Sequence, residues 1–167
     1  MTSMEARLGD ATRTVPLPDP WDVNDYLARV AAHRGRSISI RPVPADMLAE
    51  IGCRGAGLWV ARRYDDMIVY DSEATGRNAD HIILHEVGHM LLGHGPDAAD
   101  LDAPSAGALP AALAALLPAV AGQHVLGHNE FGPENEQHAQ VFADMMMVYA
   151  TLPRRRKRGL RLFGRGR

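Results

Sequence analysis

Two histidines four residues apart, His85 and His89, with Glu86 between them, are the residues of this chain best suited to chemistry. On an α-helix, residues at this spacing share one face with Cβ atoms about 5–6 Å apart, so both imidazoles can reach one zinc ion at about 2.0–2.1 Å. Glu86 would lie beside that face, where it could hold a zinc-bound water and accept its proton. Because zinc lowers the pKa of such a water to about 7, the pattern predicts metal-activated hydrolysis.

The residues around the motif predict the helix that it requires. Apolar residues recur at helical spacing on the side opposite the two histidines, at Ile83, Leu84, Val87, Met90 and Leu91. Gly93 and Pro96 then end the pattern, so we expect a helix of about four turns near residues 78–94. The alternative is a chance match on an ordinary amphipathic helix, and the helical context favours the metal site.

Zinc needs a third protein ligand, and a second predicted helix, near residues 134–147, offers two candidates. Glu136 shares a helical face with the small residues Ala139 and Ala143, whereas His138 lies on the opposite face. We choose Glu136, because the two alanines let its helix approach the metal helix closely, and His138 is then a buried or partly exposed neighbour. The alternative for Glu136 is a solvated acid in the first helical turn.

Other polar side chains are weaker candidates for the site. A metzincin would place a histidine ten residues after His85, but that position holds Gly95. His94, one position early, would project far round the helix, and we expect it to interact with the last helical carbonyls. Candidates that could stabilise the transition state or orient a ligand are Tyr70, His81, His124, His128, Gln140 and Asp144. For each of these histidines, a surface or structural role is the favoured interpretation, since one ion needs only three protein ligands.

Two motifs together resemble a known family. The motifs are residues 85–94 and, in the second helix, Glu136, Ala139, Phe142 and Ala143. They are similar to those of the ImmA/IrrE family of small bacterial zinc metallopeptidases, in particular its short actinobacterial members. Shorter similarities at residues 20–22, 57–59 and 68–70 extend the resemblance over about residues 20–150.

The resemblance implies a site, a location and a partner. It implies a cytoplasmic, gluzincin-like domain with one Zn2+ per chain, held by His85, His89 and Glu136, and with Glu86 as general base. The implied partner is a helix-turn-helix transcriptional repressor, which the protein would cleave or otherwise inactivate. The acidic group that would orient a zinc-binding histidine is not obvious, since Gln140 stands one turn after Glu136 and Asp144 a turn further.

The order of predicted elements indicates the fold. We predict a helix at residues 21–33, strands at 37–43, 57–63 and 67–71, and then the two metal-bearing helices. The predicted class is α+β and zincin-like, with a small antiparallel or mixed three-stranded sheet packed against the metal helix and the glutamate-bearing helix. Residues 57–62 are our candidate edge strand for an extended peptide, although ordinary sheet packing explains them as well.

Composition limits the domain organisation. The 167 residues, 46% of them hydrophobic, can build one core and are too few for two ordinary domains. We assign residues 1–19 to a flexible N-terminal segment, residues 20–152 to the metallopeptidase-like domain and residues 153–167 to a disordered basic tail. The single cysteine, Cys53, excludes an internal disulfide and fits a reducing compartment, and we expect it in a buried or turn position.

Charge and hydropathy argue against a signal peptide and a transmembrane segment, and they leave the role of the basic tail open. The first fifteen residues lack the apolar run of a signal peptide, and glycine and prolines break the apolar stretch at 106–122, so we predict no transmembrane segment. Residues 111–117 fit a short amphipathic helix. Residues 154–167 hold eight Arg or Lys and no acid. This tail is either a solubilising extension or a site for nucleic acid, anionic lipid or an acidic partner.

Two functions of different kinds remain. The first is a zinc endopeptidase that cleaves a regulator, and the second is a non-catalytic regulatory protein in which a metal stabilises a surface that binds a repressor or DNA. Glu86 favours the first function, because a purely structural ion needs ligands but no base. Manganese or iron could also occupy a site of two histidines and a glutamate.

Overall fold

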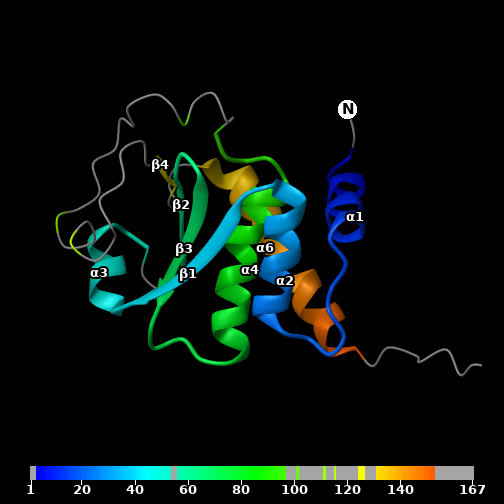
Figure 1. The fold of residues 1–167 in the computed structure, drawn as a ribbon, viewed down its shortest axis with the longest axis horizontal. Helices are drawn as coiled ribbons and strands as arrows, with labels where there is room; N and C mark the ends of the chain where they lie inside the picture. Colours follow the sequence, from blue (N-terminus) through cyan, green and yellow to red (C-terminus); the bar gives the residue numbers. More distant parts are fainter. Residues whose placement is uncertain are drawn as a thin grey trace, which may run out of the picture.

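A mixed sheet with helices on both faces organises the molecule (Figure 1). The computed structural model describes residues 3–53, 56–96, 101, 111, 115, 124–126 and 131–152. In this part, the strands β1 (Ser37–Val43), β2 (Leu58–Ala61), β3 (Asp65–Asp71) and β4 (His124–Leu126) lie in the order β1-β3-β2-β4. β1 is parallel to β3, whereas β2 is antiparallel to β3 and β4. The α+β class and the three predicted strands are confirmed, and the short β4 was not predicted.

Side chains of β2 alternate between two hydrophobic clusters, which explains why all four of its residues are buried. Trp59 and Ala61 belong to the larger cluster, which includes residues of α2 (Val23–Arg34) and α4 (Arg77–Leu91). Leu58 and Val60 belong to the smaller cluster, together with Leu48 of α3 (Ala45–Glu50). The sheet therefore has α3 on one side and both α2 and α4 on the other (Figure 1).

The two helices that carry the metal motifs, α4 and α6 (Gly132–Thr151), pack directly against each other. Their contact is close, because a Cβ atom on Gly88 would lie only 3.2 Å from the Cα and carbonyl oxygen of Ala139. α4 ends at the predicted stop, where Gly93 has a φ of 72°. α6 buries Ala139 and Ala143 on the same side as Glu136, as the sequence predicted.

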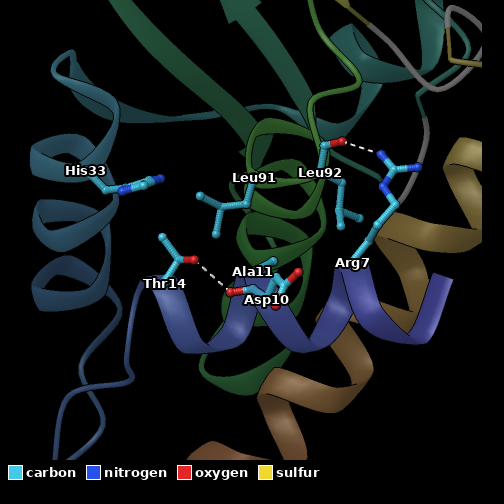
Figure 2. Close-up of a pocket in the computed structure, with 7 residues that line it drawn as sticks. All are labelled: Arg7, Asp10, Ala11, Thr14, His33, Leu91 and Leu92. Atoms are coloured by element: carbon cyan, nitrogen blue, oxygen red, sulfur yellow. Dashed lines mark hydrogen bonds between the residues drawn. The ribbon is translucent and has the colours of Figure 1, made fainter. Parts of the chain in front are cut away.

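The N-terminal residues form a helix, so the prediction of a flexible segment at residues 1–19 was wrong. α1 (Met4–Thr14) is capped by the Ser3 hydroxyl and buries Leu8 and Ala11 in the larger cluster. Arg7 donates a hydrogen bond of 2.6 Å to the backbone carbonyl of Leu92, at the C-terminal end of α4 (Figure 2). Such a donor satisfies a carbonyl that the helix itself leaves unpaired. The buried positions of α1 have helical spacing, but they are too few to be recognised in the sequence.

Some predictions fall partly or wholly outside the described residues. They are the helix at residues 111–117, described only at 111 and 115, the side chain of His128 and the basic tail at 153–167. Cys53 is buried with 3% of its surface exposed, as predicted. Within the described part of the chain, no helix is long and apolar enough to cross a membrane.

Candidate metal centre

His85 and His89 of α4 meet Glu136 of α6 in a group that could hold a metal ion. His85 Nε2 lies 3.2 Å from both His89 Nε2 and Glu136 Oε2, and His89 Nε2 lies 3.4 Å from Glu136 Oε1. Donor atoms that each lie 2.0–2.1 Å from a tetrahedral ion are about 3.3 Å apart, so these separations fit zinc-type coordination. The three predicted ligands therefore come together in the structure.

The metal group is largely buried in the described part of the chain. The exposed fraction of the side chain is 14% for His85, 11% for Glu136 and 1% for His89. Phe131 stacks on the His89 ring with centroids 3.8 Å apart, and Trp59 stacks behind Phe131 at 6.4 Å. Of the three side chains, those of His85 and Glu136 therefore retain more exposed surface than that of His89.

Glu86 is buried where α4 meets the start of β2, with 4% of its surface exposed. A Cβ atom on Gly57 would lie 2.8 Å from Glu86 Oε1, so the carboxyl group fits there because residue 57 is glycine. Burial, and then the negative charge of Glu136, raise the pKa of Glu86 to about 8, while a hydrogen bond from the backbone N–H of Trp59 lowers it. The predicted base is thus beside the ligands and has a strongly perturbed pKa.

His94 contacts the ring of His89, with their Nδ1 atoms 3.0 Å apart. A His89 that binds a metal through Nε2 carries its proton on Nδ1, so His94 Nδ1 is the acceptor of this hydrogen bond. This role requires a neutral His94, and burial followed by the positive charge of Arg7 lowers its pKa to about 4. His94 therefore holds His89 in orientation, as a carboxylate does in many zinc sites.

The prediction for the His94 side chain was wrong. Its backbone N–H donates to the carbonyl of His89 at 3.0 Å, while its ring turns back toward the metal group. The left-handed conformation of Gly93 makes this reversal possible. Helical geometry alone could not have placed His94, since it stands beyond the end of α4.

Gln140 and Asp144 contact His81, which stands one helical turn before His85. His81 Nε2 is 2.7 Å from Asp144 Oδ1, and Gln140 Nε2 donates to the same oxygen at 3.1 Å. His81 and Gln140 line a cavity of about 180 Å³ that has His85 in its wall. Tyr70, the other described candidate, packs against the larger hydrophobic cluster and is not among the residues that line this cavity.

The prediction that residues 57–62 form an edge strand was wrong. β2 pairs with β3 on one side and with β4 on the other, from Trp59 to Ala61. The sequence did not show that both edges of β2 are paired. A strand that is buried on both faces has the same apolar pattern at the edge of a sheet and in its middle. His124 lies in β4, of which only the backbone is described.

In comparisons with known protein families, curated proteins and solved structures, the chain has no match. The geometry of the metal group is therefore the main basis on which a function can be proposed. The sequence had not predicted the roles of Gly57, His94 and Phe131 around it. Gly57 and Gly93 were the available signals, since a glycine next to a chemical motif often marks a close approach or a turn.

Proposed function

We propose that the protein is a zinc-dependent endopeptidase with a zincin-like site. The observation that carries the proposal is the spacing of His85, His89 and Glu136 at 3.2–3.4 Å, with the carboxyl group of Glu86 next to them. Two imidazoles, one carboxylate and an open side are the usual equipment of a hydrolytic zinc site. A structural ion would need the ligands but no neighbouring base.

Each residue has a distinct role in the proposed reaction. His85, His89 and Glu136 would hold the ion, which when bound supplies Lewis acidity to a peptide carbonyl and lowers the pKa of water. Glu86 accepts a proton from the attacking water and delivers it to the departing amine nitrogen. The raised pKa of Glu86 suits this transfer near neutral pH, and a nearby cation favours its carboxylate form.

The burial of Glu86 supports a second candidate function. Only 4% of this residue is exposed, and its carboxyl group lies against Gly57 and accepts a hydrogen bond from the backbone N–H of Trp59. A non-catalytic protein would retain such a glutamate for packing, with the metal stabilising a surface that binds a repressor or DNA. The two candidates differ in whether Glu86 is needed for chemistry.

The partner follows from the sequence resemblance alone. If the likeness to ImmA/IrrE proteins extends to function, the substrate is a helix-turn-helix transcriptional repressor and the reaction takes place in the cytoplasm. The first substrate to test is a regulator whose gene lies next to the gene of this protein, here called the neighbouring regulator.

The test combines metal content with cleavage. We expect close to one zinc ion per wild-type chain, loss of zinc in Glu136→Ala, and unchanged zinc in Glu134→Gln, which alters an 85% exposed acid on the same helix. We also expect the neighbouring regulator to be cleaved by the wild type and not by a zinc-loaded Glu86→Gln protein. If Glu86→Gln inactivates the regulator as effectively as the wild type does, but without cleaving it, the binding function is established instead.

A further inference from the structure

A second polar cluster repeats the arrangement of the metal group one helical turn away. His81 precedes His85 by four residues on α4, and Gln140 follows Glu136 by four residues on α6. Since residues at this spacing are neighbours on a helix surface, the packing that joins the ligands also joins His81 to Gln140 and Asp144. The cluster is therefore fixed relative to the metal group by the same two helices.

The hydrogen bonds of the cluster define the proton positions. Asp144 is acceptor-only when ionised, so His81 Nε2, at 2.7 Å, donates a proton to it, and so does Gln140 Nε2 at 3.1 Å. In the described part of the chain, the contacts of His81 with Asp144 and Gln140 are both made by Nε2. The other ring nitrogen, Nδ1, is thus available to a bound molecule.

The cavity beside His85 connects this cluster to the metal group. Its volume is about 180 Å³, and its wall includes Gly57, Asn78, His81, Ile82, His85 and Gln140. His89 is closed off by Phe131 and has 1% of its side chain exposed, whereas 14% of His85 and 30% of His81 are exposed. A group that occupies this cavity therefore lies beside both His85 and His81.

We propose that this cavity binds the carbonyl or carboxylate oxygen of a peptide substrate, and that His81 is the residue that donates a hydrogen bond to it. With both ring nitrogens protonated, an imidazole donates from Nε2 to the carboxylate and from Nδ1 to an oxygen on which negative charge develops. Asp144 and Gln140 are positioning residues that fix the ring. This inference rests on the proposed metal centre and deepens it, because it names the site of the substrate oxygen.

The test uses acetohydroxamate, a small oxygen-donor probe of metal centres, and the full chain loaded with cobalt(II), whose visible absorption reports binding. We expect His81→Ala to weaken acetohydroxamate binding about tenfold, which corresponds to about 1.4 kcal/mol. Asp144→Asn should weaken it to a smaller extent, and both variants should keep the cobalt affinity of the wild type. The matched control is Glu134→Gln, which alters a histidine–acid pair within α6, Glu134 with His138, and should leave both affinities unchanged.

Two outcomes would overturn the inference. One is unchanged acetohydroxamate binding in a cobalt-loaded His81→Ala protein, and the other is a parallel loss of cobalt and acetohydroxamate affinity, which would make His81 part of the scaffold. Neither outcome depends on cleavage of a protein. A failure of the endopeptidase proposal, seen as uncleaved regulator with wild-type protein, is therefore distinguishable from a failure of this one.

Discussion

Glu86 and His94 stand on either side of the metal ligands, and burial shifts their pKa values in opposite directions. The pKa of Glu86 rises to about 8, and that of His94 falls to about 4. Both shifts favour the neutral form of the side chain near pH 7. The arrival of a cation reverses this preference for Glu86, so metal binding should release a proton from the protein.

In the metal-free protein, Glu86 should make the free energy of unfolding fall as the pH rises. Its pKa is about 8 in the folded state against a usual value of 4.5, so between these values the folded chain retains a proton that the unfolded chain has lost. One such proton contributes a slope of up to about 1.4 kcal/mol per pH unit. Denaturant unfolding of chelator-treated wild type and Glu86→Gln, between about pH 5 and 8, measures this difference. Parallel pH profiles of the two proteins would contradict it.

His94→Ala should weaken zinc binding about 10–100-fold, because His89 loses the acceptor that fixes its ring and its tautomer. Competition with a chromophoric chelator measures the affinity. His33→Ala, which removes an exposed histidine near the end of α2, is the matched control and should bind zinc like the wild type. Wild-type affinity in His94→Ala would mean that packing by Phe131 alone holds His89.

At the level of elements, the centre depends on how closely α4 and α6 approach. Gly88 is the point of contact, since an added Cβ atom would lie 3.1 Å from Phe142 Cδ1 and 3.2 Å from two backbone atoms of Ala139. Backbone atoms of a neighbouring helix yield less easily than the end of a flexible side chain. The absence of a side chain at residue 88 therefore sets the distance between the histidines and Glu136.

Gly88→Ala should destabilise the protein by about 1–3 kcal/mol, the usual cost of overpacking, and should weaken zinc binding as well. In an exposed helix the same substitution would stabilise by about 1 kcal/mol, so the sign of the change identifies the cause. Gly9→Ala in α1 is the control, because its Cβ atom would meet only the flexible end of Arg13, at 3.3 Å. Chemical denaturation of both variants provides the comparison, and a stabilised Gly88→Ala protein would contradict the close-contact argument.

The sequence predicted those elements whose pattern is local. The apolar periodicity around His85 gave α4, and the small residues Ala139 and Ala143 gave the buried side of α6 and the choice of Glu136. It did not predict α1, whose few buried positions pack against residues far away in the chain, or β4, which is defined by its pairing with β2. The ring contact of His94 was missed for the same reason, since it depends on the turn at Gly93.

At the scale of the whole molecule, three separate segments converge on the metal group. α4 carries two of the candidate ligands and α6 carries the third, while Arg7 of α1 donates to the carbonyl of Leu92. Burial, and then the charge of Arg7, lower the pKa of His94. An ion held there would tie α4 to α6 in the folded state and would have no comparable site in the unfolded chain. Metal binding should therefore stabilise the fold as a whole.

Zinc at about 100 times its dissociation constant should stabilise the folded state by about 2.7 kcal/mol. For a protein of this size that corresponds to a rise in Tm of roughly 5–10 °C, and a chelator should reverse it. Differential scanning fluorimetry with and without zinc measures the shift. Glu136→Ala should show little shift, and an equal shift in this variant would place the stabilising ion elsewhere.

Glu136 follows His85 by 51 residues, and this separation sets a delay between them during synthesis. A ribosome that adds about 5–20 residues per second needs roughly 3–10 s to travel from the first ligand to the last. During that interval the nascent chain has both histidines but no carboxylate to complete the set. A metal ion would therefore find the complete set of three candidate ligands only after α6 has docked on α4, and one that reaches the histidine pair earlier would find two.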